Sequence, residues 1–361
     1  MSTRRAPART GAAVVAALAA AALFGASAPV AKILLRDLPP LSLSALLYLG
    51  AGLGLAATRA VAATRGGVSE RAPSLRRGDA PVLLGMVVAG GILAPLALLQ
   101  GLARVSGVAG SLLLNLEAPF TIALAVAVLG ERFGRRELAA SAAILAGSCL
   151  LALQGGDGLR ADPAGVLAVV AACAGWAIDN NLTQRLSGRD PVAVAGAKSL
   201  LAGTASAVLA AILGARLPTA DTAAAAMLLG FASYGASLVL VVAAMRTLGA
   251  AREAALFSTA PFAGALLSVP LLGERIGPTE LVAATLMATG VALLAAAGSP
   301  DLHEHAEQEH EHLHRHDEHH LHAHAAGDPT GEPHAHAHRH RRLRHAHAWT
   351  ADGHHGPPCG G

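Results

Sequence analysis

The sequence predicts an all-α polytopic membrane protein, and three features of the chain support this fold class. Hydrophobic residues make up 53% of the chain and charged residues only 14%, whereas ordinary soluble domains carry about 25% charge. Ten apolar stretches approach the roughly 20 residues that a helix needs to cross a bilayer. Because these stretches are continuous and do not alternate with polar residues, they favour helices over a β-barrel.

Short separators containing Arg, Gly, Asp or Pro divide the ten predicted helices. The expected spans are 11–35, 41–63, 80–103, 107–129, 136–154, 163–186, 191–214, 222–246, 252–272 and 279–298. The first span begins like a secretory signal peptide, with a basic start, an apolar run and small residues. The apolar run continues to Leu35, so we expect a retained helix, with a cleaved signal peptide as the alternative.

The arginines between the spans predict the orientation. If the N-terminus is inside, the inner segments hold fifteen arginines and the outer segments five. Positive residues concentrate on the cytoplasmic side of membrane proteins, so both termini are expected in the cytoplasm and the protein in the cell's inner membrane. The arginines are scattered and the net charge is only +3, which is unlike a nucleic-acid-binding surface.

The chain contains an internal repeat. APFTIALAVAVLGERFGRREL (118–138) resembles APFAGALLSVPLLGERIGPTEL (260–281), and both end in GERxGxxEL. A weaker similarity links ALFGASAPVAK (22–32) with AGWAIDNNLTQ (174–184). The two halves that follow from this, 1–154 and 155–298, hold five helices each. Because five is odd, the second half must be inverted in the membrane, which is typical of transporters with a substrate site near the midplane.

The five-plus-five layout, the Pro in the fourth helix of each half and the GER after it resemble the EamA type of the drug/metabolite transporter (DMT) superfamily. The resemblance covers residues 11–298. It implies a permease, in most members an exporter, of small metabolites or drugs. One departure is Phe24-Gly25 in the first helix, where the family commonly has Trp-Gly. A histidine-rich tail is no part of the family pattern.

Glu117 is the first candidate site residue. It lies near the middle of the fourth predicted helix in NLEAP, and Pro119 leaves the Asn115 carbonyl without its helical partner. Ionisable groups inside a membrane span are costly and therefore functional candidates. The Glu117 carboxylate could bind a cationic substrate or take up and release a proton; alternatively, it only pairs with a neighbouring helix.

Polar residues also interrupt the sixth predicted helix. Asp179, Asn180 and Asn181 follow one another, and Trp176 lies one turn earlier. At least one of them must face other helices, because lipid offers no hydrogen-bond partners. They line the substrate cavity or form a clamp between helices. Lys198 in the seventh helix is expected at the depth of Asp179, as a structural ion pair or as a pair that transport breaks.

Other groups have simpler interpretations. Lys32 is expected to snorkel to the interface, and Glu131 and Glu274 to cap helices or sit in loops. Gly50 and Gly54 form a GxxxG pattern, which is weak support for a homodimer.

The body shows no enzyme signature. No histidine precedes His303 and no GxxxxGK[ST] loop is present, so a Ser-His-Asp triad, an HExxH site and an ATP-binding loop are excluded there. We therefore expect no enzymatic activity, no required cofactor and secondary transport driven by a gradient.

Residues 299–361 contain all 18 histidines of the chain. Polar and small residues fill much of the rest, so we expect a disordered tail. Closely spaced neutral imidazoles suit Ni²⁺, Zn²⁺, Co²⁺ and Cu²⁺. The predicted metal ligands are His303, His305, His310, His312, His314, His316, His319, His320, His322, His324, His334, His336, His338 and His340.

Three functions remain. The first is a proton-coupled permease that exports a small metabolite or drug and has an accessory tail. The second is a Ni²⁺, Co²⁺ or Zn²⁺ efflux permease that uses the tail as a metal collector or sensor. The third is a metal sensor that transports nothing, against which the inverted repeat argues.

Overall fold

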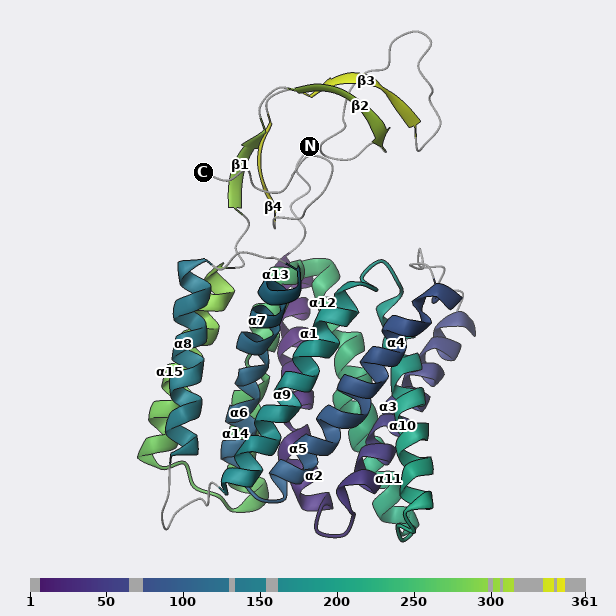
Figure 1. Ribbon diagram of the computed structural model, residues 1–361, viewed down its shortest axis with the longest axis vertical. Helices are drawn as coiled ribbons and strands as arrows, with labels where there is room; N and C mark the ends of the chain where they lie inside the picture. Colours follow the sequence, from purple (N-terminus) through teal and green to yellow (C-terminus); the bar gives the residue numbers. More distant parts are fainter. Residues whose placement is uncertain are drawn as a thin grey trace. The chain divides into compact units, whose positions relative to one another are not determined.

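The computed structural model describes residues 7–64, 74–129, 134–153 and 162–297, and four strands beyond them. The chain divides into two compact units, Met1–Ala297 and Gly298–Gly361. The first unit is a bundle of helices (Figure 1). This unit confirms the predicted all-α polytopic fold.

The described helices reproduce the predicted spans. They are α1 (Pro7–Gly25), α2 (Ser27–Leu34), α3 (Pro40–Thr64), η1 (Arg77–Asp79), α4 (Ala80–Met86), η2 (Val87–Leu93), α5 (Ala94–Leu102), α6 (Gly107–Leu113), η3 (Leu114–Leu116), α7 (Glu117–Leu129), α8 (Arg135–Ala152), α9 (Pro163–Gln184), α10 (Pro191–Ile212), α11 (Ala220–Gly230), η4 (Phe231–Ala236), α12 (Ser237–Leu248), α13 (Ala250–Phe257), α14 (Ala260–Leu272) and α15 (Pro278–Ala297). Consecutive pieces such as α1 with α2 combine into single spans.

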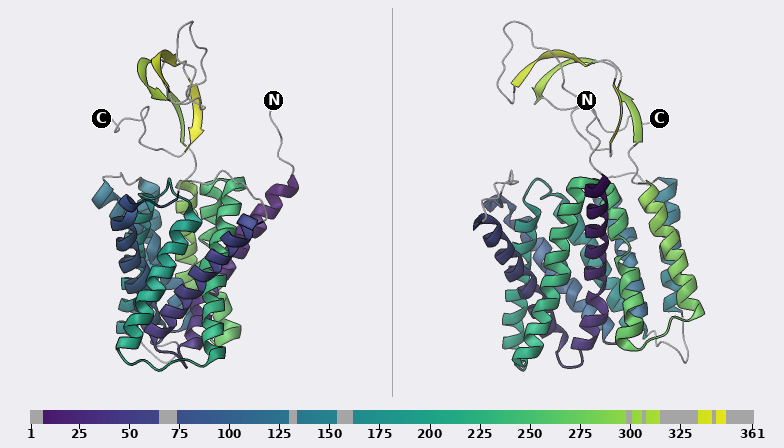
Figure 2. Two further views of the ribbon diagram at one scale, coloured as in Figure 1. Left: turned by 90° about the vertical axis from the view of Figure 1, so that its right-hand side faces the viewer. Right: turned by 180° about the vertical axis from the view of Figure 1, so that it is seen from behind.

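Nine helices of the described part of the chain are long and apolar enough to cross a membrane. The tenth predicted span is α8, whose first turn carries Arg135, Arg136 and Glu137. These three charges explain why α8 falls outside that set. Figures 1 and 2 show α8 beside α15 at one edge of the bundle, and the two helices pack closely on each other.

Local sequence explains where several helices begin. Asp162 and Asp190 are each followed by a proline, and their side chains accept hydrogen bonds from first-turn amides of α9 and α10. Aspartate is a preferred N-cap, and proline fits the first turn because its missing N–H would be unpaired there. Asp190 also forms an ion pair with Arg59 at 2.5 Å, which ties α10 to the end of α3.

The two halves are related as inverted repeats predict. Helix α1, in the first span of the first half, packs against α12, in the third span of the second half. Helix α9, in the first span of the second half, packs in the same way against α5, in the third span of the first half. The third span of each half contains a π-helical segment, η2 or η4. These matching irregularities show that the repeat extends beyond the GER motif to the backbone.

The GxxxG pattern of α3 is used inside the chain. A Cβ atom added to Gly50 would lie 2.1 Å from the Met227 carbonyl oxygen, and one added to Gly54 would lie 2.0 Å from the Phe231 ring. The absent side chains let α3 approach α11 and η4 closely. The expectation that this pattern supplies a dimer face is therefore wrong.

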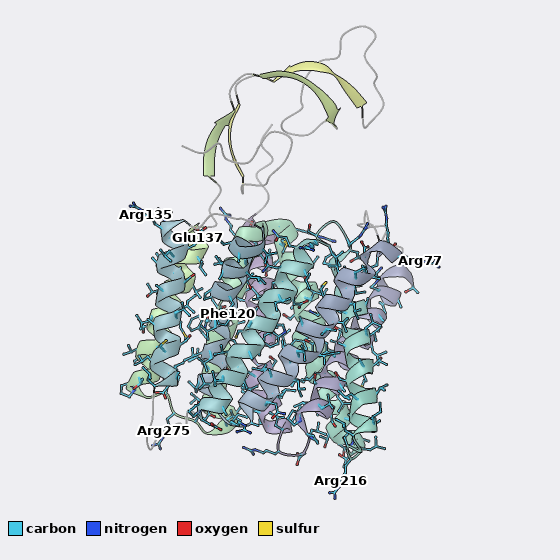
Figure 3. All side chains as sticks on the ribbon, viewed as in Figure 1. Arg77, Phe120, Arg135, Glu137, Arg216 and Arg275 are labelled. Carbon is cyan, nitrogen blue, oxygen red and sulfur yellow. The ribbon has the colours of Figure 1, made fainter. Side chains whose placement is uncertain are left out.

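The two ends of the bundle differ in their labelled arginines. Arg77 and Arg135 lie at one end and Arg216 and Arg275 at the other, with Phe120 between them (Figure 3). We call these the arginine-rich end and the arginine-poor end, because the first corresponds to the set of segments with fifteen arginines.

Lys32 is held inside the arginine-poor end. Its Nζ donates to the carbonyl oxygens of Leu102 and Val105, both at 2.6 Å. The ammonium group therefore satisfies carbonyls at and beyond the C-terminus of α5, and the expected snorkelling stays a prediction.

The second unit contains four described strands. They are β1 (Asp301–His305), β2 (Gln308–His314), β3 (His334–His340) and β4 (Leu343–His347). Strand β1 pairs with β4 and β2 with β3, both antiparallel. The alternating HxH sequence has the two-residue period of a strand, and the expected disorder of the tail stays a prediction. Five predicted metal ligands lie outside the described residues, namely His316, His319, His320, His322 and His324.

The close approach of helices predicts the effect of one glycine substitution. A Cβ atom at Gly230 would lie 1.9 Å from the Leu47 carbonyl oxygen, so Gly230→Ala forces α11 away from α3. We expect a loss of about 1–3 kcal/mol in the free energy of unfolding, the usual result of overpacking. Thermal unfolding of the purified protein in detergent measures it. Gly188→Ala is the control because nothing lies within 4 Å there; equal midpoints for both variants would contradict the packing.

Candidate functional site

The fourth span is broken just before Pro119. Helix α6 ends at Leu113, the 3₁₀ segment η3 follows, and α7 begins at Glu117. Asn115 in η3 is buried, and its Nδ2 donates to the Leu112 carbonyl oxygen at 2.8 Å. Asn115 therefore supports the break from its own helix and does not line the site described below.

Glu117 contacts the sixth span through an amide. Its Oε1 accepts a hydrogen bond from Asn180 Nδ2 at 2.7 Å, and the same Nδ2 lies 3.3 Å from Thr121 Oγ1. Asn181 Nδ2 donates to the Thr121 carbonyl oxygen at 3.1 Å. The adjacent asparagines thus join α9 to α7 along one turn, as the sequence predicted for at least one of them.

A hollow of about 300 Å³ lies beside these contacts. Its lining residues are Thr121, Ile122, Ala125, Asn180, Asn181 and Gln184. Thr121 and Gln184 were not among the residues predicted for the site. Helical spacing is the signal that could have found them, because each lies four residues after a candidate, Glu117 or Asn180, and therefore on the same helix face.

Asp179 points to a different neighbour. Its Oδ2 forms an ion pair with Lys198 Nζ, and both side chains are largely buried. This confirms the predicted contact between α9 and α10. The other carboxylate oxygen has no hydrogen-bond partner, and a Cβ at Gly90 would lie 2.3 Å from the carboxylate. Glycine at position 90 therefore makes room for the ion pair.

The Gly90 carbonyl oxygen is a second polar junction. It lies in the π-helical segment η2, and it accepts hydrogen bonds from Tyr48 Oη at 2.8 Å and Trp176 Nε1 at 3.1 Å. Trp176 was expected to line the substrate cavity. That role stays a prediction. The Trp176 indole N–H holds α9 against η2, and Tyr48, which was not among the predicted site residues, does the same from α3.

Two kinds of charged group occur at the site: the Glu117 carboxylate beside the hollow, and the Asp179–Lys198 ion pair between α9 and α10. Within the described residues, Glu117 forms no ion pair, whereas Asp179 is paired with Lys198. A carboxylate held by a neutral amide can exchange a proton or bind a cation without first breaking an ion pair. Among the described residues, no three His, Cys, Asp or Glu side chains are grouped so that they could hold a metal ion.

Comparison with known proteins matches residues 11–153 and 163–296 to the EamA-like transporter family. The chain belongs to this family. The match spans both halves of the helical bundle and confirms the resemblance drawn from the repeated GER motif. The protein is therefore a multi-pass membrane transporter of small molecules and not an enzyme.

Two similar proteins agree with this assignment. An "Uncharacterized transporter" of Methanothermobacter thermautotrophicus is 29% identical over 291 residues, which is 77% of this chain and 84% of the relative. A protein of known crystal structure shares the fold with a TM-score of 0.56 and 21% identity, over 80% of this chain and 97% of that one. At 21% identity this likeness shows only that the EamA-like transporter and that protein share a fold.

The buried ion pair predicts a non-additive effect on stability. Lys198→Met leaves the Asp179 carboxylate buried without a partner, and we expect a loss of about 3–5 kcal/mol in the free energy of unfolding. The double variant Lys198→Met/Asp179→Asn should recover most of it. A double-mutant cycle of unfolding midpoints measures the coupling. Arg104→Met is the control, because its pair with Asp162 is exposed and such pairs contribute little; additive single and double effects would refute the coupling.

Proposed function

We propose that this EamA-like transporter is a proton-coupled exporter of small organic molecules in the cell's inner membrane, with both termini in the cytoplasm. Glu117 is the coupling carboxylate, and Asn180, Asn181, Thr121 and Gln184 contact the substrate. The observation that carries the proposal is the 2.7 Å hydrogen bond between Glu117 and Asn180 beside the hollow.

The neutral partner of Glu117 supports proton coupling. An ionised Glu117 accepts the hydrogen bond from Asn180, and a protonated Glu117 still has an acceptor oxygen for it. Uptake and release of a proton therefore leave this link between α7 and α9 in place. Substrate and proton compete for one carboxylate, and an inward proton gradient then drives substrate out.

The lining of the hollow favours a small molecule with an amino group. Glu117, which is hydrogen-bonded to the lining residue Asn180, offers negative charge beside the hollow. The amides of Asn180, Asn181 and Gln184 in the lining offer both donors and acceptors. Ile122 and Ala125 add apolar surface. A volume of about 300 Å³ is at the small end of the range for ligand sites.

The tail supports a second candidate function, divalent-metal efflux. The register of β2 with β3 sets three histidine pairs opposite each other, namely His310 with His338, His312 with His336 and His314 with His334. We propose that the tail binds Ni²⁺, Zn²⁺, Co²⁺ or Cu²⁺. In the exporter of organic molecules this binding is an accessory property; in the metal-efflux permease the tail collects or senses the cargo.

A growth assay and a vesicle assay test Glu117. A strain lacking the gene, grown across a panel of metals, amino acids and drugs, identifies a compound against which the full chain protects. We expect Glu117→Gln to lose protection against an organic compound, and removal of the chain after Ser299 to keep it. In vesicles, Glu117→Gln should abolish both proton-driven accumulation of that compound and its exchange, because substrate and proton compete for the same carboxylate.

Glu137→Gln is the matched control for these assays. Glu137 accepts from the Gly134 amide at the start of α8, and glutamine supports the same cap, so transport should be unchanged. If the full chain protects the strain only against metals, and removal of the tail abolishes this protection, metal efflux is the function. If Glu117→Gln retains proton-driven accumulation, Glu117 is not the coupling residue.

Tail binding should depend on pH. Neutral imidazole is the metal ligand and histidine has an unperturbed pKa of about 6.5, so affinity should be full above this value and fall as pH decreases through it. Equilibrium dialysis of the purified full chain with Ni²⁺ or Zn²⁺ at about pH 7.5 and about pH 5.5 measures this. The chain cut after Ser299 should bind neither metal strongly; equal binding by the cut chain would place the site in the bundle.

A further inference from the structure

Glu274 connects the two halves of the bundle at the arginine-poor end. It follows Gly273, which ends α14 in a left-handed conformation. Its Oε1 accepts from the Gly107 amide at 2.7 Å and its Oε2 from the Val108 amide at 2.8 Å. Gly107 and Val108 begin α6 in the first half, so one carboxylate of the second half holds a helix of the first.

The bond between Glu274 and α6 uses amides that otherwise lack partners. The first amides of a helix have no carbonyl acceptor within it. The N-cap Ser106 takes the Ala109 amide with its Oγ at 3.0 Å, which leaves the amides of Gly107 and Val108 to Glu274. Hydrogen bonds to a charged acceptor are stronger than neutral ones, and a helix N-terminus favours negative charge.

The helices on either side of this bond pack closely. A Cβ atom on Gly107 would lie 2.4 Å from Leu272 and 2.7 Å from the Ser268 hydroxyl. One turn further along, Ser111 Oγ would lie 2.9 Å from a Cβ atom on Gly264. Ser111 is 1% exposed, so α6 and α14 leave no opening between them at this depth.

Lys32 closes the same region from the first span. Its Nζ binds the carbonyl oxygens of Leu102, the last residue of α5, and of Val105 in the loop that leads into α6. The Lys32 ammonium group therefore binds carbonyl groups at the start of the connection between α5 and α6, and the Glu274 carboxylate binds the first amides of α6 at its end.

The hollow lies toward the opposite end of the same span. Its α7 residues Thr121 and Ala125 follow Gly107 by 14 and 18 residues, or roughly 21–27 Å at 1.5 Å per residue. The fourth span is thus sealed at the arginine-poor end and hollowed beyond its break. Alternating access requires the two halves to separate at the sealed end during each cycle.

We propose that Glu274 is the positioning residue that latches the arginine-poor end shut. While its carboxylate holds the Gly107 and Val108 amides, the hollow is reachable only from the arginine-rich end; its release lets α6 part from α14 and opens the other side. The proposal rests on the transporter fold and not on the substrate or coupling ion assigned to Glu117.

Two cysteine reporters test the latch in the full chain in lipid nanodiscs, where both ends are open to reagent. In a background with Cys149, Cys173 and Cys359 replaced, Ser111→Cys reports on the sealed end and Gln184→Cys on the hollow. Adding Glu274→Ala should raise maleimide labelling of the Ser111→Cys reporter about tenfold or more, since two charge-assisted hydrogen bonds are lost. Labelling of the Gln184→Cys reporter should fall.

Glu137→Ala is the matched control, because Glu137 caps a helix of its own half; it should change neither rate. Glu274→Gln keeps one acceptor and should give an intermediate increase at the Ser111→Cys reporter. Unchanged labelling of that reporter overturns the proposal. So does a rise at both reporters, which would mean that Glu274→Ala loosens the fold. No substrate is needed, so the outcome is separate from that of the Glu117 assays.

Discussion

Lipid offers no hydrogen-bond partners, so each irregularity in a membrane helix must be satisfied by protein. This constraint determines where the polar residues of the bundle lie. The π-helical segment η2 contains the Gly90 carbonyl, and Tyr48 and Trp176 converge on it. Pro119 interrupts the fourth span, and Glu117 and Asn180 meet beside the break. Each backbone irregularity is therefore satisfied by polar side chains of neighbouring helices, and the candidate site lies beside one of them, the break before Pro119.

Glycine allows these contacts to form between helices. Gly90 leaves space for the Asp179 carboxylate, and Gly230 lets α11 reach the backbone of α3. A single added methyl group at either position would collide with its neighbour. The composition of the bundle, rich in Gly and Ala, is thus a packing requirement of a protein whose halves must contact closely and still move.

Much of the fold followed from sequence, because span length, arginine bias and an odd-numbered repeat are direct consequences of the bilayer. The Asp179–Lys198 contact was also predictable, since both residues lie at similar distances from the turn near Ser187. Tyr48 and Thr121 were not, because their roles depend on η2 and on how α9 packs against α7. Glu274 was predicted to cap a helix or sit in a loop, but not to bridge the halves, since its partners lie more than 160 residues away. The roles of the site residues in transport stay predictions.

The neutral Asp179–Lys198 pair has an electrical consequence. The membrane potential does work only on net charge, at about 2.3 kcal/mol for one elementary charge per 100 mV. A paired carboxylate and ammonium therefore feel little net force when the bundle rearranges. The partner of Glu117 is an amide and not a cation. In this part of the bundle the membrane potential therefore acts mainly on the charge of Glu117, or on the charge of the ion or substrate that Glu117 binds.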